Sequence, residues 1–300
     1  GVPEGWTDIS NDAAALKKAG AVALSDDGMP VQNANLLRDA LIRCRRQELT
    51  ILSHCEDADL VKNYAVNEGR VSRALGLPGR PAIAEELQVM RDAMLAEETG
   101  AAVHICHIST ARSVEIVRQF KKKGVPITCE TCPQYFALTE DELLSRGTLA
   151  RVNPPLRTRL DVEGILAGLK DGTIDVIATD HAPHSAEEKA VLPVWKAPSG
   201  IIGLETALGL AVTELVKKGH LTTMQLVEKM CVNPAKLYHF DKGYLAEGKD
   251  ADIVIFNENE EWTVTDAEIA SKSHNTPFIG TKLFGRVKYT ICGGNIVYKD

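Results

Sequence analysis

The chain has 300 residues, of which 44% are hydrophobic and 25% are charged, and its formal net charge is −7. These values are ordinary for a globular protein with a large core, and the negative charge disfavours nucleic acid or an anionic membrane as a partner. No apolar run approaches the ~18 residues of a membrane span, and seven scattered cysteines are typical of reduced thiols. We therefore expect a cytoplasmic protein.

Short apolar runs that stop at an acid or a histidine recur along the chain. Such a run is typical of a buried parallel strand that ends in a functional site. The runs are 21–24 before Asp27, 49–53 before His54, 101–106 before His107 and 175–179 before Asp180. A fifth run, 126–129, leads into Glu130 and offers no obvious ligand.

Stretches with helical character separate these runs. They cover residues 33–46, 84–99, 111–123 and 160–170. Alternation of strand and helix predicts βα units around a parallel sheet, which is the α/β class. We assign residues 1–242 to this barrel-like unit.

The last part of the chain changes character. From residue 243 onward it turns to short β-like runs at 251–256, 287–292 and 295–298, and Gly293-Gly294 predicts a hairpin between the last two. We therefore predict a second unit of β-strands over residues 243–300.

Asp27, His54, His107 and Asp180 share one predicted position, the end of a strand. Taken singly, each has a simpler explanation, because an acid there often caps the next helix and a lone histidine is often structural. Four such residues at equivalent positions favour a functional site, since the carboxyl ends of barrel strands meet at one face. Imidazole and carboxylate are the usual ligands of catalytic zinc, and a bridging acid can hold two ions roughly 3.5–4 Å apart.

Taken in order, the motifs resemble those of the dihydroorotase branch of the amidohydrolase superfamily. They are Ser25-Asp-Asp-Gly28, His54-Cys-Glu-Asp57, His104-Ile-Cys-His107, Asn153-Pro-Pro-Leu-Arg157 and Thr179-Asp-His-Ala-Pro-His184. The resemblance implies a partial TIM-type (β/α)8 barrel, strands 4–8, followed by strands of a small accessory β-sandwich. It also implies zinc-dependent interconversion of N-carbamoyl-L-aspartate and (S)-dihydroorotate in de novo pyrimidine (UMP) biosynthesis.

The same resemblance implies a role for each site residue. Asp27 would be a carboxylate shared by two zinc ions, and His54 and His107 would bind the second ion. Asp180 would bind the first ion and act as general base and then acid. The substrate contacts would be Asn153, His184, Ser199 and Gly200, with one or two Zn²⁺ ions per complete site.

One motif of the superfamily is missing from this sequence. The first barrel strand of its members ends in a His-x-His pair that binds the first zinc, and none of the eight histidines forms such a pair. We therefore expect a chain that lacks the N-terminal third of its relatives and is inactive alone. The resemblance also implies a homodimer, with aspartate transcarbamoylase as a candidate partner.

Two alternatives to a dihydroorotase stay open. The first is another cyclic-amide hydrolase, such as dihydropyrimidinase (hydantoinase) or allantoinase. Those relatives bridge their metals with a carboxylated lysine on the fourth strand, whereas here that strand ends in Ser25-Asp-Asp-Gly28. The second is a non-catalytic, dihydroorotase-like scaffold.

Overall fold

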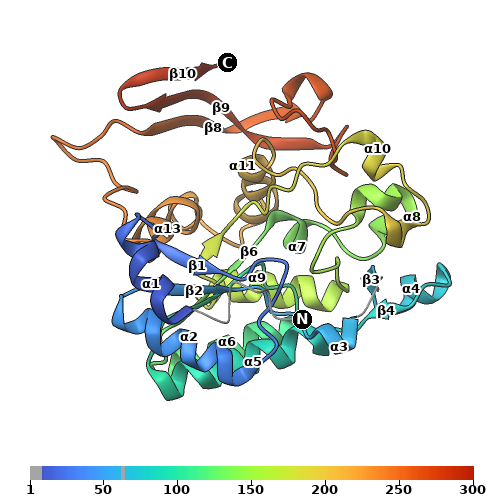
Figure 1. Cartoon of the computed structure of the whole chain (residues 1–300). Helices are drawn as coiled ribbons and strands as arrows, with labels where there is room; N and C mark the ends of the chain where they lie inside the picture. Colours follow the sequence, from blue (N-terminus) through green and yellow to red (C-terminus); the bar gives the residue numbers. More distant parts are fainter. Residues whose placement is uncertain (1–8, 62–64) are drawn as a thin grey trace.

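A five-stranded parallel sheet forms the centre of the chain. The computed structural model describes residues 9–61 and 65–300. The strands are adjacent in the order β1-β2-β5-β6-β7 (Figure 1), and their bounds are Ala23–Ser25, Thr50–Ser53, Val103–Ile105, Ile127–Thr131 and Val176–Ile177. Each lies within or next to a run expected to be a strand. The predicted α/β class, with a parallel sheet equivalent to part of a barrel, is confirmed.

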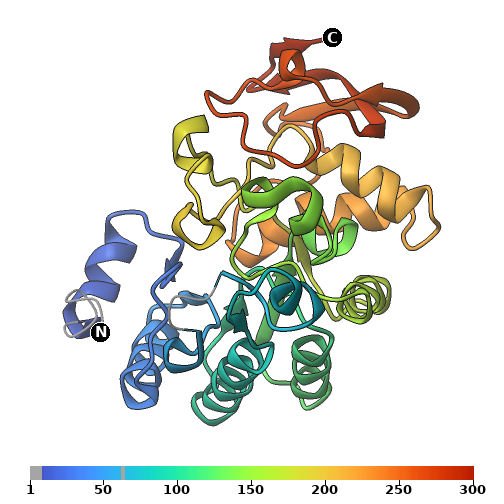
Figure 2. The same cartoon turned by 90° about the vertical axis from the view of Figure 1, so that its right-hand side faces the viewer.

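Helices cover one face of this sheet. The expected helices are α2 (Ala34–Arg46), α5 (Ile83–Thr99), α6 (Ala111–Lys122) and α9 (Arg159–Asp171), and α1 (Ile9–Lys18) packs beside α2. Figure 2 shows α2, α5 and α6 side by side along the edge of the molecule opposite the C-terminal strands. The predicted start of α2 was one residue early, because Asn33 caps the helix by accepting hydrogen bonds from Asn35 N and Leu36 N.

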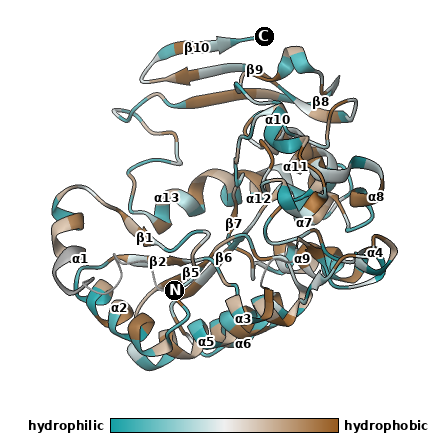
Figure 3. Cartoon of the chain, turned by 45° about the vertical axis from the view of Figure 1, so that its right-hand side comes forward, coloured by the Kyte–Doolittle hydropathy of each residue, from teal (hydrophilic) through white to brown (hydrophobic). Residues whose placement is uncertain are grey.

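The core lies between the sheet and these helices. Ile51, Val103 and Ile127 form one row across three neighbouring strands, and all three are buried in the main hydrophobic cluster. Figure 3 shows that the helices carry both hydrophobic and hydrophilic residues, as expected when one face is buried. The next row, which includes His104 and Thr128, alternates to the opposite face of the sheet.

A two-stranded parallel sheet lies between β2 and α5 and was not predicted. It pairs β3 (Val66–Asn67) with β4 (Gly79–Arg80), next to the short helices α3 (Ala58–Val61) and α4 (Arg70–Ala74). Neither strand lies in a longer apolar run, as the two-residue strand β7 does, so the sequence pattern could not reveal them. The pairing matters because it fixes the backbone of Arg80 beside the proposed site.

Short helices make up the rest of the α/β part. They are α7 (Pro133–Ala137), α8 (Glu142–Arg146), α10 (Ala186–Lys189), α11 (Ala207–Ala211), α12 (Thr223–Val227) and α13 (Asn233–Leu237), with π-helical turns at Val212–Val216 and Glu228–Val232 and 3-10 turns at Gly147–Ala150 and Val194–Lys196. A further 3-10 turn, Asp266–Glu268, belongs to the C-terminal part of the chain. Within the described residues, no helix is both long and apolar enough to cross a membrane.

The C-terminal residues form a separate antiparallel sheet in the order β10-β9-β8. Its strands are β8 (Ile253–Thr263), β9 (Lys282–Cys292) and β10 (Asn295–Lys299). The predicted hairpin is present, since Gly293 and Gly294 both have positive φ between β9 and β10. Both β8 and β9 are longer than expected, because their pairing resumes at Glu261 and Phe284 after an irregularity that follows Asn257. The predicted unit boundary at 242/243 stays a prediction.

Candidate metal centre

Parallel strands place the four predicted ligand residues at one edge of the sheet. Asp27 follows β1, His54 follows β2, His107 follows β5 and Asp180 follows β7. Because the strands run in the same direction, their carboxyl ends lie at the same face. The structure thus brings together Asp27 and His107, which are 80 residues apart in the sequence (107 − 27 = 80).

Asp27, His54 and His107 form a close cluster, and their potential ligand atoms all lie within 4.8 Å of one another. Asp27 Oδ1 is 3.6 Å from His54 Nδ1 and 3.8 Å from His107 Nε2, and the two ring nitrogens are 2.8 Å apart. The imidazole rings meet edge to face at 78°. Zinc lies about 2.0–2.1 Å from each histidine nitrogen that binds it, so these atoms are close enough to share one ion. The donor set therefore fits zinc.

The charges in this cluster reinforce one another. The nearby imidazole rings of His107 and His54 hold the pKa of Asp27 well below its ordinary value. Burial alone would lower the pKa of His54, but its contacts with Asp27 and Glu56 outweigh burial and raise that pKa to about 9. A cation is therefore favoured between Asp27 and the two rings, either as a proton or as a metal ion.

The two neighbouring acids after β1 differ in their surroundings. Asp26 is buried, and its carboxylate accepts hydrogen bonds from the backbone N–H groups of His54 (2.7 Å) and Val31 (3.0 Å). Burial raises its pKa. The Asp27 side chain is 70% exposed and faces both histidines. Asp26 thus holds the turn together, while Asp27 remains available as a ligand.

Asp180 lies outside the three-residue cluster but within its electrostatic field. Burial raises the pKa of its carboxyl group, the charges of His107 and His54 oppose that rise, and the charge of Asp27 adds to it. Asp180 and His107 both have positive φ, at 47° and 33°. Such backbone strain in residues other than glycine is concentrated at functional sites.

Asn153, a predicted substrate contact, reaches the cluster. Its Nδ2 is 3.2 Å from His54 Nε2, the ring nitrogen on the side away from Asp27. This amide therefore lies directly beside a candidate metal ligand.

The other predicted substrate contacts form a second group on loops after β7. His184 Nε2 donates a hydrogen bond to the carbonyl oxygen of Ser199 at 2.9 Å. Gly200 has φ of 129°, and a Cβ atom there would lie 2.5 Å from Ala182 Cβ. Only glycine fits at this position, which explains why residue 200 is a glycine.

Two residues that the sequence analysis did not identify hold this loop group in place. Lys189 is buried, and its ammonium donates to the carbonyl oxygens of Arg151, Pro198 and Gly200 at 3.0–3.3 Å. Burial lowers its pKa to about 8. Asn275 donates to the carbonyl oxygens of Ala182 and Gly200. Nothing in the sequence pattern marks either residue, because both act through contacts between distant segments.

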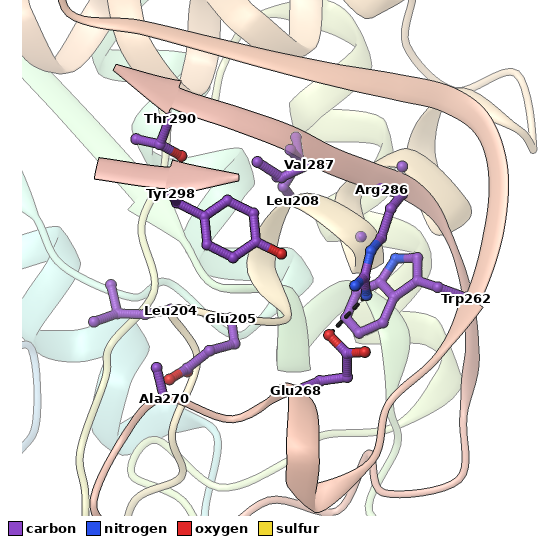
Figure 4. A pocket seen from close by; sticks show the side chains of 12 residues that line it. Leu204, Glu205, Leu208, Trp262, Glu268, Ala270, Arg286, Val287, Thr290 and Tyr298 are labelled. Atoms are coloured by element: carbon purple, nitrogen blue, oxygen red, sulfur yellow. Dashed lines mark hydrogen bonds and ion pairs between the residues drawn. The ribbon is translucent and has the colours of Figure 1, made fainter. Parts of the chain in front are cut away.

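A cavity of about 260 Å³ lies elsewhere, between α11 and the C-terminal sheet. Figure 4 shows Arg286 paired with Glu268 and lying against the Trp262 ring. The N–O distance of this ion pair is 2.7 Å. None of the predicted site residues lines the cavity. Its walls come from α11, the loop before it and the C-terminal part of the chain, and none of them belongs to the candidate metal centre.

A parallel barrel-type sheet with histidine and carboxylate ligands at its strand ends defines a class of metal-dependent hydrolases. The profile of the amidohydrolase family matches residues 5–297. The chain belongs to the amidohydrolase family.

Sequence relatives and solved structures agree with this family. The dihydroorotase of Acetivibrio thermocellus is 54% identical over 95% of this chain and 67% of its own length, and that of Clostridioides difficile is 52% identical over 96% and 68%. The chain thus spans about two thirds of these relatives. An L-hydantoinase (dihydropyrimidinase) from Arthrobacter aurescens has a TM-score of 0.85 at 28% identity, covering 100% of this chain and 68% of that one. A D-hydantoinase has a TM-score of 0.86 at 24% identity, covering 97% and 67%, and shows the fold alone.

Proposed function

We propose that this chain carries the catalytic part of a dihydroorotase, which interconverts N-carbamoyl-L-aspartate and (S)-dihydroorotate in pyrimidine synthesis. The observation that carries the proposal is the cluster of Asp27, His54 and His107 in a chain about half identical to proteins named dihydroorotase. The acid after β1 also favours this activity over a relative that bridges its metals through a carboxylated lysine.

The described residues divide the reaction between them. Zinc, when bound, lowers the pKa of a water molecule and polarises the amide carbonyl group. Asp180 takes a proton from the attacking water and delivers it to the ring nitrogen as the C–N bond breaks. The burial that raises the pKa of Asp180 suits a group that must both accept and release a proton. Asn153, His184, Ser199 and Gly200 orient the substrate.

The number of zinc ions and the activity of this chain alone belong to the same proposal. Asp27, His54 and His107 supply three ligands for one ion, which is enough for a catalytic zinc with one open position. The other ion would have only Asp27 and Asp180 from this sequence. We therefore propose that the chain by itself binds one zinc and has little or no activity.

A hydantoinase or dihydropyrimidinase is the second candidate, because solved structures with those names share the fold. We expect a form of the protein that is active to hydrolyse dihydroorotate with a far higher kcat/KM than dihydrouracil or allantoin. Steady-state rates with the three substrates decide between the candidates. A preference for dihydrouracil would move the assignment to dihydropyrimidinase, and activity with none would support a scaffold.

Lys189 offers a separate prediction about substrate binding. Lys189→Met removes the donor shared by three carbonyl groups, so the loop that carries Ser199 and Gly200 should lose its fixed position. In a form of the protein that turns over dihydroorotate, we expect KM to rise roughly tenfold, while zinc content stays unchanged. In the native protein, the ammonium loses a donor hydrogen as the pH passes about 8.

The pH dependence of KM, compared between the native protein and Lys189→Met, tests the same role of Lys189. Between pH 7 and 9 the native KM should rise, whereas the Lys189→Met protein should show no additional rise from this group. Lys196→Met, in an exposed 3-10 turn of the same loop region, should leave KM unchanged. An unaltered KM in Lys189→Met would contradict the role given to the loop.

A homodimer and an association with aspartate transcarbamoylase complete the proposal for the whole protein. Light scattering of the purified protein, alone and mixed with that transcarbamoylase, tests both.

A further inference from the structure

The side of His54 away from the metal cluster is occupied by a carboxylate. Glu56 lies two residues after His54, its side chain is 17% exposed, and its Oε2 is 3.6 Å from His54 Nε2. Gln32 fixes the turn that carries both residues. Its Nε2 donates to the carbonyl oxygen of Glu56, and its Oε1 accepts from Ala58 N. The carboxylate therefore has a defined position beside the ring.

Arg80 holds this carboxylate from the other side. Its Nη1 is 2.6 Å from Glu56 Oε2 and also donates to Asn153 Oδ1. The Arg80 backbone is itself fixed, since its carbonyl oxygen accepts hydrogen bonds from Glu68 N and Arg157 Nη1. Three segments that are distant in sequence thus meet at the Nε2 face of His54.

The contact with Arg80 settles the orientation of the Asn153 amide. A guanidinium can only donate hydrogen bonds, so the Asn153 atom that faces it must be the oxygen. The Nδ2 group of Asn153, which can only donate, is then the atom 3.2 Å from His54 Nε2. As positioned here, Asn153 Nδ2 donates to Nε2, which then carries no hydrogen. When Nε2 does carry a hydrogen, Asn153 cannot accept it, and the Asn153 N–H must be accepted elsewhere.

The chemistry of His54 then requires another acceptor. The Nδ1 atom of His54 faces Asp27 and His107, so a metal ion held in this cluster would take Nδ1 as its ligand, and the ring hydrogen would then reside on Nε2. Ligand histidines commonly donate this hydrogen to a carboxylate, which fixes the tautomer and the ring orientation. Glu56 is the carboxylate within reach, and a small side-chain shift brings its oxygen to hydrogen-bond distance.

We propose that Glu56 and Arg80 are positioning residues for the metal centre. Glu56 accepts the Nε2 hydrogen of His54 and so keeps Nδ1 available as a ligand. Arg80 holds the Glu56 carboxylate and, through Asn153 Oδ1, turns the Asn153 Nδ2 group toward the space beside His54. One guanidinium thereby links a metal ligand to a substrate contact. This inference rests on the metal site of the proposed function.

Zinc affinity of the purified chain, measured by competition with a chelator, tests the inference without any need for activity. Glu56→Ala should weaken zinc binding by roughly 10–100-fold, the usual cost of losing such a partner. Glu56→Gln keeps an acceptor oxygen and should lose less zinc affinity than Glu56→Ala. The zinc affinity of Arg80→Met should lie between those of the native chain and Glu56→Ala. Glu86→Gln is the matched control, because this acid is similarly buried but its ion pair is with Arg112.

A second measurement separates positioning from general stability. In histidine-labelled, zinc-loaded chain, the Nε2-bound hydrogen of His54 should give a protected NMR signal that Glu56→Ala abolishes, while metal-free melting temperatures stay within a few degrees of native. Equal zinc affinity of the native and Glu56→Ala chains would overturn this inference but leave the proposed metal site intact. Failure of the native chain to bind zinc would overturn the metal site and this inference with it.

Discussion

Replacing Asp180 with asparagine is expected to lower kcat for dihydroorotate by at least about 10²-fold while zinc stays bound. Asparagine keeps the size of the side chain and one ligand oxygen, but it cannot take the proton of the attacking water. The substitution should be made in a form of the protein that turns over dihydroorotate. Single-turnover rates and elemental analysis of the same sample report the two quantities separately.

The neighbouring acid after β1 provides the control for Asp180. Asp26→Asn should change kcat much less, because both oxygens of Asp26 bind backbone N–H groups rather than facing the reaction. Its expected effect is on stability instead. If Asp180→Asn retained near-native kcat with zinc in place, the proton carrier would have to be another residue.

The strand ends could be predicted from the sequence because they depend on local patterns. A buried parallel strand is an unbroken apolar run, and a ligand placed after it interrupts the pattern at once, as at His54 and Asp180. Four repeats of that signal were enough to predict the sheet and the cluster of Asp27, His54 and His107. The strand order and the common edge then follow from βα connections.

Residues that act through distant contacts could not be predicted in this way. Glu56 looks like an ordinary acid in a turn, and Arg80 lies in a strand of two residues. Lys189 and Asn275 meet the loop around Gly200 only after folding, and Asn275 is 75 residues further along the chain. No periodicity or motif marks such positions, since their role comes from tertiary packing.

The roles of the adjacent residues Asp26 and Asp27 also depend on tertiary contacts that the sequence pattern does not reveal. Both are acids after the same strand, and only the family resemblance assigned the ligand role to Asp27. The structure gives a physical reason, because the backbone of the turn occupies Asp26 and leaves the carboxylate of Asp27 directed at the histidines. The extension of β8 through a polar stretch was likewise set by its partner β9 rather than by its own composition.

The folded chain is expected to hold about one tightly bound zinc, and His54→Asn should abolish that binding. Three ligands from Asp27, His54 and His107 leave one position for water, which suffices for zinc. Loss of one ligand leaves two, so zinc affinity should fall by more than the roughly 10–100-fold loss expected when a residue that hydrogen-bonds to a ligand is removed.

His104→Asn is the control, because this buried histidine precedes His107 in the same segment but contacts Thr128 and Glu130 instead. Elemental analysis after dialysis against a weak chelator gives the zinc content of each protein. Two tightly held ions in the native chain would mean that ligands other than Asp27 and Asp180 complete the first site, and an unchanged content in His54→Asn would exclude His54 as a ligand.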